Sequence, residues 1–273
     1  MSKPTGFHVR HDFQPELARE LLLLLRAADT EIDEAWLQSA AAERGYRLRH
    51  RKEYGKLLSS FADLDLLLRD KDRLRLTRAG QVLADVVRLQ PETLAEYIHF
   101  LYYTAYSADQ TKRFSWSYRL VCETLWENAP SQVNRDRLVG MVSQLAAETF
   151  ETDAVSFSVS SVGGILNWLE QLTPSVFTAR EAVRYFTRRP YCPIETFFLA
   201  INHWYDQLRN RETVYVPITE DFRLAVCRLC LLIPEAFDEM LAQTEAAFTV
   251  LQVRRERGER LAITQFDWTM LQG

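Results

Sequence analysis

Residues 68–78 of this 273-residue chain read LRDKDRLRLTR and combine a high charge density with apolar residues. An arginine guanidinium donates hydrogen bonds in a planar fork that matches a phosphate group. Arg73 and Arg75 alternate with leucines, so in a β-strand both arginines would lie on one face and both leucines on the other. The pattern predicts a strand with a phosphate-binding outer face. The alternative is a solvated hairpin whose charges prevent edge pairing, and Asp70 and Asp72 favour it because they would repel DNA.

The basic residues around this strand form a local patch. Between Arg44 and Arg78 the sequence has eleven Lys or Arg and five Asp or Glu, a local charge of +6 in a chain whose net charge is −4. Because the whole chain has no excess positive charge, attraction to nucleic acid has to come from such a patch. A second arginine-rich stretch, RRERGER at 254–260, is a weaker candidate of the same kind.

Motifs for catalysis or metal binding are missing from the sequence. It has no Walker loop and no GxGxxG or GxSxG pattern. Cys227 and Cys230 form a CxxC pair within an apolar helical run, which indicates buried thiols rather than a zinc or redox site. His203 and Asp206 lie one helical turn apart, but a surface pair beside an aromatic core is a simpler interpretation than an acid–base pair. We therefore expect no catalytic residue, metal ligand or cofactor.

Two further groups of residues are interpreted as structural. His8 and His11 precede the first predicted helix without a set of carboxylates nearby, which favours a flexible arm over a metal site. Phe114, Trp116 and Tyr118 could stack on unpaired bases. Three aromatic residues at two-residue spacing do not share one helical face, so core packing is expected for them.

The apolar periodicity predicts the elements that position the basic patch. Helices are expected at 14–28, 33–44 and 52–66, then a hairpin with strands 66–69 and 73–76 around a turn at 70–72, then a helix from 78 to about 89. The basic residues fall at the start of the third helix and on the hairpin. They are Arg49, Arg51, Lys52 and Lys56, and Arg69, Lys71, Arg73 and Arg75.

This order of elements resembles a winged helix-turn-helix domain. The stretch LDLLLRDKDRLRLTRAGQVLA is similar to the wing and following helix of many bacterial winged-helix proteins. The resemblance covers residues 14–89 and identifies no particular family within that class. It implies that the third helix enters the major groove of DNA while the wing contacts the backbone. The eight basic residues named above would then contact DNA.

The remainder of the chain is predicted to be mostly helical. The whole chain is thus divided into three regions: a winged helix-turn-helix domain at 1–90, an aromatic-rich helical domain at 91–212, and a C-terminal region at 213–273. The last region has a short β-prone run, two helical patterns and an arginine-rich hairpin, which are compatible with a second winged helix. Its DNA-contact candidates are Arg254, Arg255, Arg257 and Arg260.

Composition narrows the class of protein. The chain is 47% hydrophobic and 26% charged, as in globular proteins, and no apolar run is long enough to cross a bilayer. No secretory leader is recognisable, so a cytoplasmic protein with reduced cysteines and no membrane partner is expected.

The sequence therefore predicts a mainly α-helical, non-catalytic protein that binds double-stranded DNA. It would act as a transcription regulator or as a DNA-targeting accessory subunit of a bacterial multi-protein system such as genome defence, alone or as a homodimer. The alternative is an interaction or scaffold subunit that docks onto proteins and never contacts DNA, and the acidic remainder of the chain favours it. An enzyme with an unrecognised site in the middle region is a third hypothesis.

Overall fold

The computed structural model describes residues 6–10, 14–28, 30–46, 51–180, 183–209, 214–256 and 258–264, with the backbone alone at 51–53 and 180. The helices are α1 (Pro15–Ala28), α2 (Glu34–Glu43), α3 (Arg51–Asp63), α4 (Arg78–Leu89), α5 (Leu94–Ala108), α6 (Arg113–Glu127), α7 (Arg135–Phe150), α8 (Val159–Leu169), α9 (Ile194–Leu208), α10 (Glu220–Cys230) and α11 (Phe237–Ala247), with 3-10 turns η1 (Pro91–Thr93) and η2 (Pro234–Ala236). The strands are β1 (Ile32–Asp33), β2 (Leu67–Asp70), β3 (Arg73–Leu76), β4 (Ser131–Gln132), β5 (Phe177–Arg180), β6 (Val183–Phe186), β7 (Val216–Pro217), β8 (Leu251–Arg254) and β9 (Arg260–Ile263). The predicted mainly α-helical class is confirmed.

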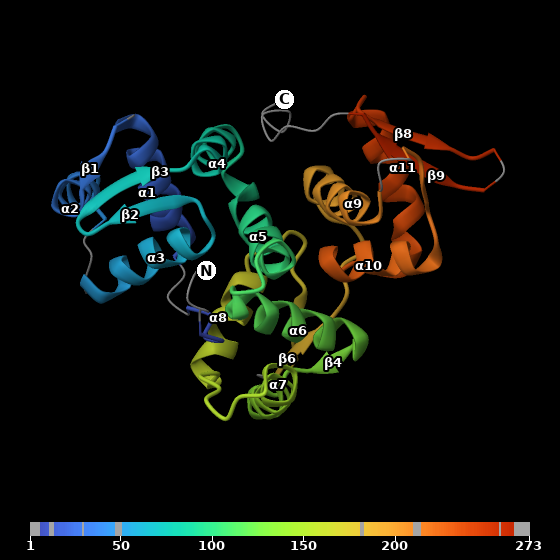
Figure 1. The fold of residues 1–273 in the computed structure, drawn as a ribbon, viewed down its shortest axis with the longest axis horizontal. Coiled ribbons are helices and arrows are strands. Elements are labelled where there is room, and N and C mark those ends of the chain that lie inside the picture. Colours follow the sequence, from blue (N-terminus) through green and yellow to red (C-terminus); the bar gives the residue numbers. More distant parts are fainter. Residues whose placement is uncertain are drawn as a thin grey trace.

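The first group of elements runs from α1 to β3 and is called the first unit (Figure 1). Its antiparallel sheet has the order β1-β3-β2, and Leu67 of β2 pairs with Leu76 of β3. The predicted hairpin is confirmed. The two-residue strand β1 was not predicted, since the second helix was expected to begin at residue 33. In the structure Asp33 pairs with Arg73 and also caps α2, by accepting a 2.6 Å hydrogen bond from the Trp36 amide. Strand β1 thus joins the start of α2 to the hairpin.

The same order of elements occurs twice more in the described residues. The middle unit runs from α6 to β6 with a sheet ordered β4-β6-β5, and the C-terminal unit runs from α9 to β9 with a sheet ordered β7-β9-β8. Each unit has a helix, a two-residue strand, two helices and a hairpin. Figure 1 shows the three units as separate groups around α5.

Two features of this repetition differ from the sequence analysis. Residues 178–187 lie in the region 91–212 that was predicted to be helical, whereas residues 177–180 and 183–186 form the β5–β6 hairpin. The prediction is wrong because the apolar spacing of this short stretch fits either structure, and pairing of β6 with the distant β4 decides for the strand. In addition, α9, which lies within the predicted helical domain, packs against α10 and α11 of the C-terminal unit.

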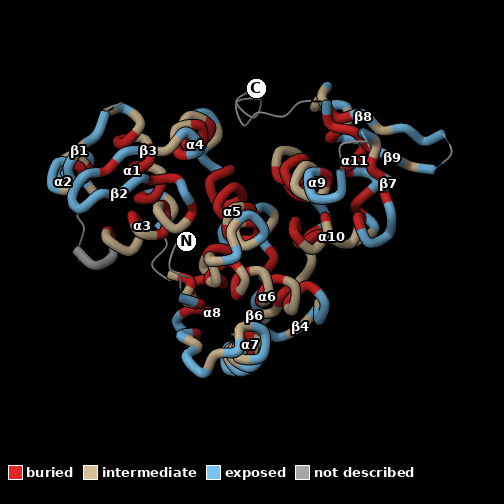
Figure 2. The backbone as a smooth tube through the Cα atoms, in the orientation of Figure 1, coloured by how far each residue is buried: buried red, intermediate tan, exposed pale blue. Residues whose placement is uncertain are grey.

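Helix α5 lies at the centre of the molecule, where Figure 2 shows it as mostly buried. It packs against α1 of the first unit, α6 and α8 of the middle unit, and α9 of the C-terminal unit. Among its buried residues are Glu96, at 1% exposure, and His99, which is fully buried. Burying these polar groups requires partners inside the protein, since water cannot reach them.

The buried partner of Glu96 is Arg189, which follows the β5–β6 hairpin. The two Nη atoms of Arg189 donate to the two carboxylate oxygens of Glu96 at 2.6 and 2.9 Å. Arg189 also donates from Nε to the Cys230 carbonyl at 2.7 Å and from Nη1 to the Thr173 carbonyl at 3.1 Å. The guanidinium holds the pKa of Glu96 below its ordinary value against the opposing effect of burial. This ion pair therefore connects α5 to both the middle and C-terminal units.

His99 makes a second polar connection. Its Nε2 lies 2.7 Å from the carbonyl oxygen of Leu229 in α10, and its Nδ1 lies 2.8 Å from the hydroxyl of Tyr118 in α6. Since a carbonyl can only accept, Nε2 carries the proton and Nδ1 accepts from Tyr118. Burial lowers the pKa of His99 to about 4, so the ring is neutral at pH 7.

We expect Glu96→Gln to destabilise the protein by about 3–5 kcal/mol in urea denaturation at pH 7, because it leaves the buried Arg189 charge uncompensated. The control is Glu170→Gln, since the pair of Glu170 with Arg184 is largely exposed. This control should cost less than about 1 kcal/mol. Equal losses in the two variants would show that the buried pair does not stabilise the arrangement.

We expect the free energy of unfolding to fall as the pH is lowered from 6.5 towards 4. The unfolded protein binds a proton at His99 near pH 6.5, whereas the folded protein does so only near 4. The loss attributable to His99 is on the order of 3 kcal/mol. His99→Gln should flatten part of this slope, and His203, whose pKa burial also lowers to about 4, and Glu96, whose pKa is lowered by Arg189, contribute to the remainder. An imidazole NMR signal of His99 that titrates near pH 6.5 in the folded protein would contradict the assignment.

Candidate nucleic-acid interface

The third helix of the first unit begins at Arg51, one residue before its predicted start. Lys56 lies one turn further along and is half-buried. Arg49 lies outside the described residues, and for Arg51 and Lys52 the structure describes only the backbone. The basic positions at the start of α3 thus lie within its first two turns, the part of the helix that reads bases in a groove-reading helix.

The β2–β3 hairpin has the alternation expected from the sequence. Leu74 and Leu76 are buried, while Arg73 and Arg75 are exposed on the opposite face of β3. Lys71 occupies the turn between the strands with a positive φ of 52°. The two arginines therefore point outward from the core.

Acidic residues lie beside two of the four hairpin cations. Nη2 of Arg69 lies 2.8 Å from a carboxylate oxygen of Glu34 at the start of α2. Nε of Arg73 lies 3.7 Å from a carboxylate oxygen of Glu31, and Asp33 and Asp70 are its cross-strand neighbours. Sequence reasoning missed Glu31 and Glu34 because they precede the hairpin by a whole helix pair. The hairpin tip is therefore less basic than the sequence suggested.

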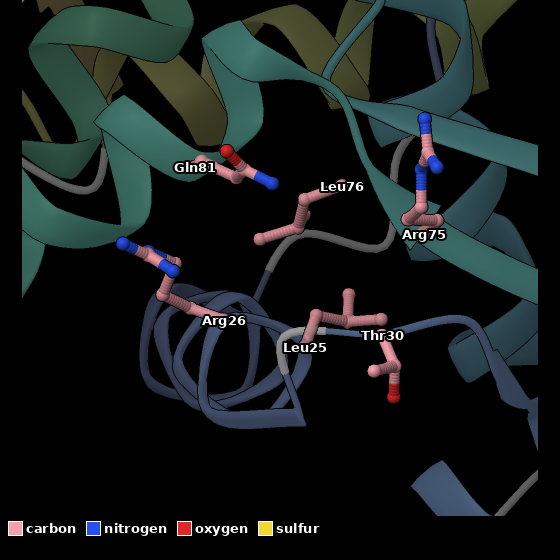
Figure 3. Close-up of a pocket in the computed structure, with 6 residues that line it drawn as sticks. All are labelled: Leu25, Arg26, Thr30, Arg75, Leu76 and Gln81. Atoms are coloured by element: carbon pink, nitrogen blue, oxygen red, sulfur yellow. The ribbon is translucent and has the colours of Figure 1, made fainter.

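Arg75 has different surroundings from Arg69 and Arg73. Its cross-strand partner is Leu68, an exposed apolar residue, rather than an acid. A hollow of about 260 Å³ lies beside it, between the end of α1, strand β3 and the start of α4. In Figure 3, Arg26 and Arg75 lie on opposite sides of this hollow, whose other lining residues are Leu25, Thr30, Leu76 and Gln81. Arg26 forms a bidentate ion pair with Asp85, with both hydrogen bonds at 3.1 Å. Of the two arginines beside the hollow, Arg75 is therefore the one better placed to bind an external anion.

The hairpin of the C-terminal unit is also partly neutralised. Arg254 stacks over the ring of Tyr215 at 4.0 Å from its centroid. Arg255 pairs with Glu245 at 3.1 Å and with Glu259 at 3.9 Å. Arg260 lies opposite Arg254 and is exposed, and Arg257 lies outside the described residues. Helix α11, which precedes this hairpin, carries three acidic residues and no basic one.

The remaining candidate sites have structural roles. Cys227 and Cys230 are fully buried, and burial raises their pKa values, as expected for core thiols. His203 hydrogen-bonds to Gln207, whereas Asp206 pairs with Arg209 at 3.0 Å. Phe114 and Tyr118 are buried and Trp116 packs against the core, which confirms the expected packing.

Metal clusters and membrane-crossing helices are both absent from the part of the chain that the structure describes. Within the described ranges, no group of three or more His, Cys, Asp or Glu residues is arranged to hold a metal ion. None of the described helices combines the length and apolar character needed to cross a membrane.

Comparison with known proteins gave no match. No protein-family model, no curated protein and no solved structure matches this chain. Any functional argument therefore depends on the residues and contacts described above.

Substitutions of Arg69 and Arg75 on the hairpin should differ in their effect on stability. We expect Arg69→Ala to lower the free energy of unfolding by about 1 kcal/mol, because it removes a partly buried ion pair with Glu34. Arg75→Ala should change it by less than about 0.5 kcal/mol, as for an exposed residue that has no acidic partner among the residues the structure describes. Urea denaturation at low and high salt measures both, and an equal effect of the two substitutions would contradict the distinction.

Proposed function

We propose that this chain is a non-catalytic DNA-binding protein that contacts duplex DNA with its first unit. In this proposal it is a transcription regulator or a DNA-targeting accessory subunit of a bacterial multi-protein system. The observation that carries the proposal is the combination, within the first unit, of basic positions at the start of the third helix and exposed arginines on the outer face of the hairpin.

The topology of the first unit supports this assignment. The order helix, short strand, two helices and hairpin, with sheet order β1-β3-β2, supports the proposal that the first unit is a winged helix-turn-helix domain. In that arrangement the third helix enters the major groove and the hairpin lies along the backbone. Arg51, Lys52 and Lys56 of α3 would then face the groove, and Arg75 would contact a phosphate. Arg69, Lys71 and Arg73 would contribute less, since acids surround them.

The other two units are less suited to DNA. Helix α8 of the middle unit contains no charged residue, and residues 6–10 lie against it. Helix α11 of the C-terminal unit is acidic and would be repelled by phosphates. The exposed Arg254 and Arg260 could add a backbone contact, but they do not form a basic surface with their third helix. We therefore assign DNA recognition to the first unit and other roles to the middle and C-terminal units.

The acidic residues beside the first hairpin and on α11 favour a second function. The pairing of Arg69 and Arg73 with glutamates, together with the acidic α11, is what a protein-docking subunit would show. In this alternative the three units bind other proteins and the first unit never contacts DNA.

Fluorescence anisotropy with a random duplex and a single strand of about 30 nucleotides tests the two functions. We expect duplex binding that weakens with salt, and a log–log salt slope that falls by about 0.9 for each phosphate that a variant no longer neutralises. Arg75→Ala should flatten the slope by that amount, and Lys56→Glu should weaken binding further.

The matched control is Arg137→Glu, which makes a charge reversal on an exposed residue of the middle unit. This variant should bind the duplex like the unaltered protein. If the folded protein binds no duplex at low salt, or if Arg75→Ala and Arg137→Glu behave alike, the first unit is not a DNA contact. Co-purification of a stoichiometric protein partner would then favour the docking function.

A further inference from the structure

Residues 6–10, GFHVR, are here called the strap. They form no helix or strand, yet Phe7 is 2% and Val9 is 1% exposed. Figure 1 shows this segment beside α8, the third helix of the middle unit. The expectation of a flexible arm before α1 is therefore wrong for residues 6–10, because both apolar side chains are buried and Phe7 packs against the middle unit.

Phe7 binds to an aromatic surface made by α6 and α7. Its ring meets Trp116 and Phe150 edge to face, with centroids 6.2 and 5.2 Å away. The guanidinium of Arg113 lies over both Phe7 and Phe150, at 5.5 and 4.7 Å. Such contacts select an aromatic side chain by geometry as well as by size.

The backbone of the strap crosses α8 at a glycine. A Cβ atom on Gly164 would lie 2.7 Å from the Arg10 carbonyl oxygen and 2.9 Å from that of Val9, too close for any side chain. A Cβ on the neighbouring Gly163 would meet no atom within 4 Å. His8 adds a side-chain contact of 2.6 Å to Ser161. The surface is thus shaped for the main chain of an extended peptide.

The far end of the strap reaches the first unit. Nε of Arg10 donates to a carboxylate oxygen of Asp63, at the end of α3, at 3.2 Å. Lys112 at the start of α6 pairs with Asp65 close by. The strap therefore links the surface of α8 to the end of α3, and both groups of the Arg10–Asp63 ion pair are about one-third exposed.

We propose that this surface of the middle unit, formed by Trp116, Phe150 and Gly164, is a peptide-binding site that the strap occupies within the same chain. Its partner in trans would be an extended peptide with the same pattern: aromatic, any residue, β-branched aliphatic, arginine. Side chains and one partly exposed ion pair hold the strap, with no strand pairing, so a competing peptide can replace it. The proposal does not depend on DNA binding.

The test uses the full chain with the strap detached by Phe7→Asp/Val9→Asp. A fluorescein-labelled GFHVR peptide should bind this variant at least tenfold more tightly than the unaltered protein, because the attached strap competes in the unaltered protein. Binding is followed by anisotropy, with GSHSR as the control peptide. Adding Gly164→Ala to the detached variant should abolish binding, whereas adding Gly163→Ala should leave it unchanged.

Absence of peptide binding to the folded, detached variant would overturn the proposal, and so would equal binding with Gly163→Ala and Gly164→Ala. If the double aspartate variant does not fold, hydrogen exchange of Phe7→Ala gives the answer. Faster exchange confined to the strap and α8 supports a replaceable peptide. Faster exchange throughout the middle unit would show instead that the strap is an inseparable part of its core.

Discussion

The buried ion pair between Arg189 and Glu96 determines how α5, the middle unit and the C-terminal unit are joined. A guanidinium at 0% side-chain exposure is tolerated only where an opposite charge and further hydrogen-bond acceptors surround it. Glu96 supplies the charge from α5, and the carbonyls of Thr173 and Cys230 accept two further N–H groups. Glu96 in turn accepts from the Thr173 amide at 3.0 Å. These groups come from four separate stretches of the chain, so the pair can form in only one arrangement of α5 with the middle and C-terminal units.

The end of α10 extends this constraint. The last carbonyls of a helix have no partner within the helix, and here they lie in the interior. Leu229 accepts from His99, Cys230 from the Arg189 side chain, Leu231 from the Arg189 amide at 2.9 Å and Leu232 from the indole of Trp126 at 2.7 Å. The donors all belong to α5, α6 or the segment after β6. The middle unit thus caps a helix of the C-terminal unit, and the cation of Arg189 suits the negative end of that helix.

Local patterns in the sequence were enough to predict the helices and the hairpin of the first unit, but not β1. The alternation of Arg73 and Arg75 with leucines placed the hairpin and its faces, and the predicted start of α4 at residue 78 agrees with the structure, where Thr77 caps this helix by accepting from the Gly80 amide at 3.0 Å. The β5–β6 hairpin was missed because its identity as a sheet depends on pairing with β4, a two-residue strand that has no periodic signal of its own.

Dependence on contacts between distant elements also explains what was missed at the candidate sites. The basic positions of the hairpin were visible in the sequence, but Glu31 and Glu34 reach Arg73 and Arg69 only because β1 pairs with β3. The burial of Phe7 depends on Trp116 and Phe150, more than a hundred residues away. Single-sequence periodicity reports which face of an element is apolar, whereas these contacts depend on which elements meet.

The three units show how one frame can carry different surfaces. Buried positions must keep their shape and hydrogen bonds, whereas substitutions on an exposed helix face change stability by less than about 0.5 kcal/mol. The third helices accordingly differ: α3 begins with basic residues, α8 is uncharged and covered by the strap, and α11 is acidic. In the proposed DNA complex, phosphates would repel the acidic α11 and attract the basic stretch 44–78 of the chain, so the field of the DNA would orient the chain before any base is read.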